Sequence, residues 1–194
     1  GAVSFDGTGD TLTIPQNANL DFGSGDCTVE CFLYISSHAA DKTIVGRWES
    51  SDQAWQLAYG AGGSNNQFSF MENISGTQAA LSSVLSTNYT KQWVHLVGQR
   101  SGNTLQIYVN GVRETSFSTQ TNPDQNDAST MGDAHIIEVG RGGEDSSYAN
   151  YYMAETVYQN NSATTPVDKF GEYDADSGIW IPKDVSGLTF GTNG

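Results

Sequence analysis

Short runs of alternating apolar and polar residues recur along the chain, and clusters of Gly, Asn, Asp and Ser separate them. Alternation is typical of a β-strand with one buried face, and the spacing of these runs is typical of an all-β sandwich. No segment has the 3.6-residue period of a long amphipathic helix. The pattern predicts strands at Ala2–Phe5, Thr11–Ile14, Cys27–Ile35, Thr43–Trp48, Ala54–Tyr59, Gln67–Met71, Trp93–Arg100, Thr104–Val109, Val112–Phe117, Ile136–Gly140 and Tyr151–Tyr158.

The longest alternating run predicts the most regular strand, at Cys27–Ile35. Four residues along a strand span about 13 Å, which exceeds the reach of a disulfide. Cys27 and Cys31 are therefore expected to be free, buried thiols on the core face, together with Val29 and Leu33. The opposite face of this strand is expected to carry Thr28, Glu30, Phe32 and Tyr34.

Other segments indicate how the chain is organised. The dipeptide Asn110-Gly111 predicts a type I′ turn, and the polar stretch Ser118–Asp133 is expected to be a surface loop. No shift in composition marks a domain boundary, so residues 1–194 are expected to form a single β-sandwich domain. Because the chain begins at Gly1 without an initiator Met or a signal peptide, we expect it to be excerpted from a longer protein.

The charge balance argues against several functions. Lys and Arg number 8 against 22 Asp and Glu, which gives a formal net charge of −14 at pH 7. Nucleic acids and anionic membrane surfaces attract cationic proteins, so neither is an expected partner. No run approaches the roughly 20 apolar residues that a membrane-spanning helix needs, so no membrane insertion is expected. The many polar, uncharged residues favour a β-protein that works outside a cell.

Four segments of the first 117 residues follow one another in a distinctive order: Val3–Asp10, Phe22–Glu30, Trp93–Leu105 and Tyr108–Gly111. Together they resemble the concanavalin A-like, laminin-G-like family of β-sandwich domains. The resemblance implies a jelly roll of two antiparallel sheets, with ligands bound on the loop rim or on the concave face.

The C-terminal part of the chain narrows this resemblance. Its segments are similar to those of laminin-G-like domains in structural proteins of phages and large aquatic viruses. The resemblance implies a virion or extracellular location, with host-surface glycans or other virion subunits as partners. The segments are Met153–Glu155, Ala163–Pro166, Phe170–Asp174, Trp180–Lys183 and Gly191–Gly194.

Candidate sugar-binding residues are aromatic side chains close to carboxylates or amides. Pyranose rings stack on aromatic faces, while polar groups bind the sugar hydroxyls. Three tyrosines and two acids share a segment without a core pattern, and we expect them to bind ligand: Tyr148, Tyr151, Tyr152, Glu144 and Asp145. Three tryptophans fall within predicted strands and are expected to pack in the core: Trp48, Trp55 and Trp93.

Calcium is the expected cofactor, as a structural ion, because it prefers the carboxylate and carbonyl oxygens that this acidic chain supplies. Asp6 and Asp10 frame a Gly-rich turn and are the first candidate ligands. Relatives carry an acid where this chain has Ala154, so Glu155 or main-chain oxygens are expected to substitute. Residues 122–127 and 174–178 are alternative sites. The competing interpretation is that all these Asx side chains shape turns by accepting backbone hydrogen bonds.

Catalytic residues are not expected. Glucanases of this fold place carboxylates alternately on one strand, as Glu-x-Asp-x-x-Glu. The nearest match contains Glu172, Asp174 and Asp176, but it lacks the third acid and its neighbours indicate a loop. His95 alternates with core positions and is expected to be a hydrogen-bonded structural residue.

We therefore expect a non-catalytic recognition or display module of a virion structural protein that binds host-surface carbohydrate. Two alternatives remain open, namely a purely structural virion packing domain and a laminarinase-type glycoside hydrolase. An exposed aromatic residue beside an open groove would favour binding, and a filled groove would favour packing. Paired carboxylates across a cleft would favour the hydrolase.

Overall fold

Strands make up most of the regular structure of the chain. The computed structural model describes residues 1–17, 23–37, 41–49, 52–60, 66–73, 77–82, 84–123, 136–142, 148–160 and 167–188. The strands are β1 (Val3–Asp6), β2 (Leu12–Ile14), β3 (Cys27–Ile35), β4 (Lys42–Glu49), β5 (Asp52–Tyr59), β6 (Phe68–Asn73), β7 (Thr77–Ser82), β8 (Trp93–Ser101), β9 (Thr104–Val109), β10 (Val112–Arg113), β11 (Phe117–Thr121), β12 (Ile137–Val139), β13 (Asn150–Asn160), β14 (Gly171–Tyr173) and β15 (Trp180–Pro182). A single 3-10 turn, η3 (Val167–Lys169), is the helical element of these residues. None of the described helices is long and apolar enough to cross a membrane.

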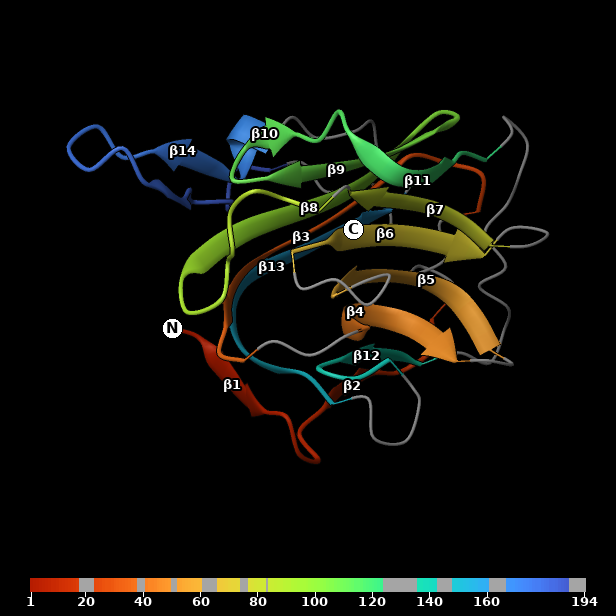
Figure 1. Cartoon of the computed structure of the whole chain (residues 1–194). Coiled ribbons are helices and arrows are strands. Elements are labelled where there is room, and N and C mark those ends of the chain that lie inside the picture. The colour runs from red at the N-terminus through yellow and green to blue at the C-terminus, as the bar shows by residue number, and fades with distance from the viewer. Residues whose placement is uncertain are drawn as a thin grey trace.

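Two antiparallel sheets pack face to face and enclose the core (Figure 1). The six-stranded sheet has the order β1-β13-β3-β8-β9-β10, and the seven-stranded sheet has the order β11-β7-β6-β5-β4-β12-β2. The short hairpin β14–β15 forms a third, separate sheet. The predicted all-β, two-sheet sandwich is therefore confirmed.

Strand β3 follows the predicted alternation. Cys27, Val29, Cys31 and Leu33 all lie in the core between the sheets, and both cysteines are free. The opposite face of β3 is also buried up to Phe32, whereas Tyr34 is only half-buried. A second layer must therefore cover most of the outer surface of this strand.

A buried ion pair joins the two sheets near one end of the core. Arg100 Nη1 on β8 lies 3.1 Å from Glu72 Oε2 on β6, and neither side chain is exposed. Cys27 Sγ donates to the other carboxylate oxygen of Glu72 over 3.6 Å. Burial raises the pKa of Glu72 to about 7, although the charge of Arg100 opposes this shift. The pair keeps both charges satisfied in a region without solvent.

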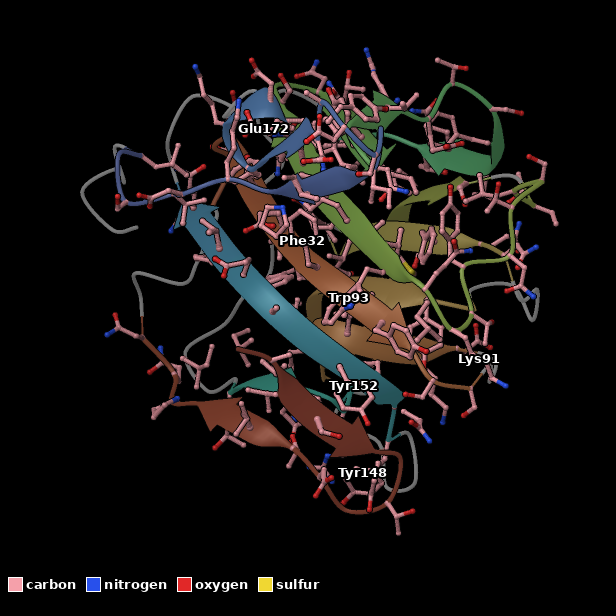
Figure 2. All side chains as sticks on the ribbon, turned by 90° about the vertical axis from the view of Figure 1, so that its left-hand side faces the viewer. Phe32, Lys91, Trp93, Tyr148, Tyr152 and Glu172 are labelled. Carbon is pink, nitrogen blue, oxygen red and sulfur yellow. The ribbon has the colours of Figure 1, made fainter. Side chains whose placement is uncertain are left out.

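A short segment near the C-terminus covers part of the outer face of the six-stranded sheet. Residues 167–183, here named the cap, contain η3 and the hairpin β14–β15. Phe170 is 1 % exposed, and the indole of Trp180 contacts the sheet over β8. The hairpin crosses one end of this face and leaves the part around Trp93 and Tyr152 open (Figure 2).

The predicted strand at Val112–Phe117 is wrong in its extent. The chain pairs with β9 only at β10, then crosses to the other sheet, where β11 pairs with β7. Strand β11 thus occupies the start of the stretch Ser118–Asp133 that was expected to be a loop, and residues 124–133 lie outside the described residues. The predicted type I′ turn is confirmed, because Asn110 and Gly111 have φ of 48° and 78°.

Candidate functional site

Three aromatic side chains lie side by side on the outer face of the six-stranded sheet. Tyr152 on β13 is the register partner of Tyr34 on β3, which is in turn the partner of Trp93 on β8. The ring centroids are 5.9 Å apart in both neighbouring pairs. Trp93 is 48 % exposed and Tyr152 is 44 % exposed, so the row is open to solvent. We name these three residues the aromatic row.

The aromatic row is rigid but not flat. The Tyr34 ring is inclined by 61° to Trp93 and by 75° to Tyr152, so the neighbouring rings meet edge to face. All three side chains project from hydrogen-bonded strands, which limits the entropy lost when a ligand binds. Figure 2 shows Trp93 and Tyr152 on the open middle of the face, with Lys91 at its edge. The register also places Ser4 of β1 beside Tyr152.

The same face continues beneath the cap, where its residues are buried. Phe32 stacks on His95 with a centroid distance of 4.4 Å, and Trp180 stacks on His95 at 6.0 Å. Trp180 Nε1 donates to His95 Nδ1 over 3.0 Å, and His95 Nε2 lies 3.1 Å from Glu30 Oε2. The imidazole of His95 is thus one of the groups that hold the cap on the sheet.

These contacts determine the protonation of His95. The indole N–H only donates, so Nδ1 must accept, and the neutral ring carries its proton on Nε2 and donates to Glu30. Burial lowers the pKa of His95 to about 3, which is consistent with a neutral ring. Burial also raises the pKa of Glu30 to about 9, and the charge of Glu155 adds to this shift. Shifted pKa values often mark catalytic groups, but here coverage by the cap accounts for them.

Two glycines provide the space that Trp180 occupies. A Cβ built on Gly111 would lie 2.4 Å from Cη2 of the Trp180 ring, and one built on Gly171 would lie 2.4 Å from its Nε1. Tyr173 packs against Trp180 and its hydroxyl donates to the carbonyl of Asn110 over 3.3 Å. The boundary between the capped and open halves of the face is therefore set by close packing.

The five expected sugar-binding residues do not form one site. Tyr152 belongs to the aromatic row. Tyr151 is fully buried, and its hydroxyl donates to the carbonyl of Ile44 over 2.8 Å, so it is a core residue that a ligand cannot reach. The expectation for Tyr151 is corrected by the strand alternation itself, which places neighbours on opposite faces. Glu144 and Asp145 lie outside the described residues.

Tyr148 is half-buried against a network of charged side chains. The guanidinium of Arg141 lies 5.6 Å from the centre of the Tyr148 ring. Arg141 donates to Glu138 Oε1 over 2.6 Å and 3.1 Å, and Arg47 lies 3.5 Å from Glu138 Oε2. Glu138 is completely buried on β12. Its pairing with the arginines gives Tyr148 a packing role in this network, apart from the aromatic row.

The expected metal ligands are separated by the length of β1. Asp6 and Asp10 adjoin at the turn after β1, whereas Glu155 follows Met153, the register partner of Val3 at the other end of the strand. Three residues of a strand span roughly 10 Å, which is too far for one ion. Asp10 Oδ2 accepts from the Asp6 amide over 3.0 Å, and Asp6 Oδ1 accepts from Thr8 over 2.7 Å.

These hydrogen bonds agree with the turn-shaping interpretation of Asp6 and Asp10. The described parts of the chain contain no group of three or more His, Cys, Asp or Glu side chains that could hold a metal ion. Calcium binding at the turn stays a prediction, without Glu155 as its third ligand.

The acidic run that most resembles a glucanase motif lies on the cap. Glu172 of β14 forms an ion pair with Lys183 at 3.2 Å and is half-exposed. Asp174 accepts hydrogen bonds from the amide and hydroxyl of Ser177, at 2.7 Å and 2.6 Å, and closes the hairpin turn. These hydrogen bonds lower the pKa of Asp174, so it stays ionised as a turn residue.

Sequence reasoning missed two of the three residues of the aromatic row. Trp93 was expected in the core, but it is the first residue of β8 and faces outward. The same expectation is confirmed for Trp55, which is 1 % exposed. Tyr34 was correctly placed on the outer face of β3 without being recognised as a ligand candidate. Alternation alone could have placed Trp93 outward, because it is two residues from His95, which shares that face.

The antiparallel two-sheet sandwich places the chain in the class of lectin-like β-sandwich folds, in which function depends on the site that each member carries. Residues 6–160 match the laminin-G-like branch of the concanavalin A-like lectin/glucanases superfamily, and the chain belongs to this family. The resemblance to the concanavalin A-like, laminin-G-like family is thereby confirmed. A search of curated proteins found no matching relative.

Solved structures share the fold at low sequence identity. A candidate carbohydrate-binding protein of Bacteroides ovatus has a TM-score of 0.63 and 16 % identity over 98 % of this chain and 53 % of its own. The binding domain of Paraclostridial Mosquitocidal Protein 1 has a TM-score of 0.60 and 10 % identity over 86 % of this chain and 41 % of its own. Domain 4 of the Geobacillus stearothermophilus arabinanase AbnA, solved with arabinotriose, has a TM-score of 0.58 and 17 % identity over 85 % and 72 %. The chain spans about half or less of the first two proteins, and these identities show a shared fold only.

Proposed function

We propose that this chain is a non-catalytic carbohydrate-binding domain that holds a glycan on the aromatic row. The observation that carries this proposal is the solvent exposure of Trp93 and Tyr152 on neighbouring strands of a rigid sheet. Large aromatic side chains are usually covered in a folded protein, and an exposed cluster of them indicates a binding surface. The lectin-like fold and the named functions of two structural neighbours support a glycan as the ligand.

The edge-to-face geometry of the rings favours a particular mode of binding. A single flat platform would suit a crystalline polymer surface, whereas these inclined rings offer separate stacking faces. Each ring can receive the C–H face of one pyranose or furanose unit. The hydroxyls of Tyr34 and Tyr152 and the ammonium group of Lys91 are the polar groups available to the sugar hydroxyls. We therefore expect a soluble oligosaccharide chain to bind across the strands.

The non-catalytic part of the proposal is supported by the positions of the carboxylates. None of the residues that the register places in the aromatic row is acidic. Glu172 and Asp174 are engaged within the cap, and the carboxyl group of Glu30 is buried under it. Hydrolysis of a glycoside needs two carboxyl groups on either side of the scissile bond.

The expected result with laminarin, agarose or carrageenan is no release of reducing ends above a blank. Release that Glu172→Gln or Asp174→Asn abolishes would instead establish the laminarinase-type alternative.

The binding experiment is a glycan array on the purified domain, followed by titration calorimetry with the best ligand. Trp93→Ala and Tyr152→Ala are each expected to weaken binding by about five- to tenfold, the value of one lost stacking contact. Tyr173→Ala is the matched control, because Tyr173 is 57 % exposed but lies on the cap. A control that weakens binding as much as Trp93→Ala, or an array without any ligand, would contradict the proposal.

We also propose that the domain displays this site on a virion, outside the cell. Support comes from the similarity of its C-terminal segments to phage and aquatic-virus structural proteins. Two of those segments, 170–174 and 180–183, form the strands of the cap and the turns that flank them. Mass spectrometry of purified particles from the source is the test, and absence of the protein from particles would overturn this setting. A packing role would be favoured instead if neighbouring virion subunits covered the aromatic row.

A further inference from the structure

The sandwich is open along one side, between the edge strands β1 and β2. Among the described strands, β1 is the last of the six-stranded sheet and β2 is the last of the seven-stranded sheet. Residues 7–11 connect them, so both free edges border the same opening (Figure 1). We name this opening between β1 and β2 the seam.

Core-facing side chains of both edge strands are exposed at the seam. Val3 is the register partner of Met153, Leu12 of Val139, and Ile14 of Ile137, and these three partners are buried in the core. Val3, Leu12 and Ile14 themselves are 49 %, 50 % and 41 % exposed. An inward-facing apolar side chain normally becomes buried when a sandwich closes. The core is therefore exposed at this side, where none of the described strands covers it.

The seam contains a groove of about 660 Å³ that reaches the core. Its lining is mostly apolar, and it includes the buried side chains of Phe5, Met153 and Val139. Glu155 is the charged side chain of the lining, and it lies at the end opposite to Asp6 and Asp10. The groove thus has an apolar middle and an acidic residue at or near each end.

We propose that the seam binds an extended strand of another polypeptide, with apolar residues at alternate positions and basic residues at both ends. An incoming strand can satisfy the unpaired backbone groups of an edge strand and insert every second side chain into the groove. Its basic residues would face Glu155 at one end and Asp6 with Asp10 at the other. Charge complementarity therefore selects a cationic segment.

Two other occupants are disfavoured, a second copy of this chain by its charge and a sugar by the apolar lining of the groove. A second copy of this chain would bring a net charge of −14 against another −14 and set acidic ends against acidic ends. A sugar would find neither a polar cluster nor an exposed aromatic face in this groove, since Phe5 is only 2 % exposed. The seam is thus a protein-binding surface separate from the aromatic row.

The test uses a fluorescent peptide with the sequence Lys-Lys-Val-Ser-Val-Ser-Val-Lys-Lys and fluorescence anisotropy. Saturable binding is expected, and it should weaken as salt rises because the end contacts are ionic. Val3→Lys and Glu155→Lys are each expected to weaken binding by about tenfold or more, since an edge charge blocks strand addition and a reversed charge repels the peptide. Leu12→Ser serves as a second variant if Val3→Lys lowers the thermal midpoint.

Matched controls separate this surface from general stickiness. Val112→Lys changes an equally apolar residue, 57 % exposed on the other edge strand β10, and should leave binding unchanged. A peptide with Glu in place of every Lys should bind at least tenfold more weakly. The proposal is overturned if the parent shows no saturable binding, or if Val112→Lys weakens it as much as Val3→Lys. It is also overturned if sedimentation shows a dimer that Val3→Lys dissociates, because the occupant would then be a second copy.

Discussion

At the scale of single residues, His95 links the outer face of the six-stranded sheet to the cap. Its ring contacts both Phe32 and Trp180, and both of its nitrogens have hydrogen-bond partners. A protonated ring would direct an N–H at the indole N–H, so the cap contact requires the neutral form. On the other side of the ring, the buried carboxyl group of Glu30 accepts the hydrogen bond that Nε2 of the neutral form donates. Stability should therefore depend on pH at both ends of the range.

The pH dependence has a definite sign. The pKa of His95 is lowered to about 3, so the unfolded state binds a proton first, and stability is lost as pH falls from about 6.5 to 3. The pKa of Glu30 is raised to about 9, so the folded state keeps its proton longer, and stability is lost as pH rises from about 4.5 to 9. Each proton contributes a slope of about 1.4 kcal/mol per pH unit.

Denaturant unfolding between pH 7 and 8.5 tests the contribution of Glu30. The raised pKa of Glu72, about 7, lies at the lower bound of this window, so Glu72 contributes less to the slope within it. Glu30→Gln should flatten the slope there. His95→Gln should remove the opposing contribution of the imidazole, so that between pH 4.5 and 6 stability falls more steeply with rising pH in the variant than in the parent. Glu114→Gln is the control, since Glu114 is only half-buried and its raised pKa has no charged partner. Unchanged slopes in both variants would show that the buried pair does not titrate as described.

Calcium can be tested at the turn that Asp6 and Asp10 form. The high negative charge and two adjacent carboxylates lead us to expect a higher thermal midpoint in millimolar calcium than in EDTA. Asp6→Asn and Asp10→Asn should each remove the difference, whereas Asp176→Asn on the cap should not. No shift in the parent would leave these residues with their turn hydrogen bonds alone. An equal shift in both variants would move the ion elsewhere.

At the scale of elements, alternation predicted most strands that have one apolar face. It missed β7, which places Ala80 in the core, and it missed strands without an apolar face. Strand β11, Phe117–Thr121, is exposed along most of its length, so its sequence has no apolar rhythm. Strands β14 and β15 are three residues each, too short for a pattern to develop. The aromatic row could be predicted in part, since Tyr34 and Tyr152 face outward by alternation. What the sequence could not show is where the cap ends, because that depends on contacts between residues far apart in the chain.

The cap can be displaced by one methyl group. The Cβ of Gly171→Ala would lie 2.4 Å from Trp180 Nε1, and this glycine does not have a positive φ, so the effect is purely steric. We expect a loss of about 1 to 3 kcal/mol in the free energy of unfolding, together with faster proteolysis within residues 167–183. Gly187→Ala is the control, because a Cβ there meets no atom within 4 Å. Equal protease resistance of both variants would show that Trp180 does not hold the cap.

At the scale of the whole molecule, the net charge of −14 restricts which glycans can bind. Repulsion by the overall field is long-ranged and is screened by salt, whereas stacking on the aromatic row is short-ranged and insensitive to it. Neutral oligosaccharides should therefore bind with the same affinity at 20 mM and 500 mM salt. Alginate or carrageenan oligomers should bind more weakly, and improve by several-fold as salt rises. Tight binding of an anionic glycan at low salt would show that a local cationic group, such as Lys91, outweighs the field.

The division of one sheet face into a capped half and an open half has an evolutionary consequence. The cap is attached at the C-terminal side of the sandwich and contributes nothing to the core between the two main sheets. Lengthening its hairpin would cover neighbouring rows of the same sheet and shortening it would uncover them, while the core between the two main sheets keeps the same residues. Related chains can thus acquire a wider or narrower recognition surface through insertions and deletions at one hairpin, while the sandwich beneath it is inherited unchanged.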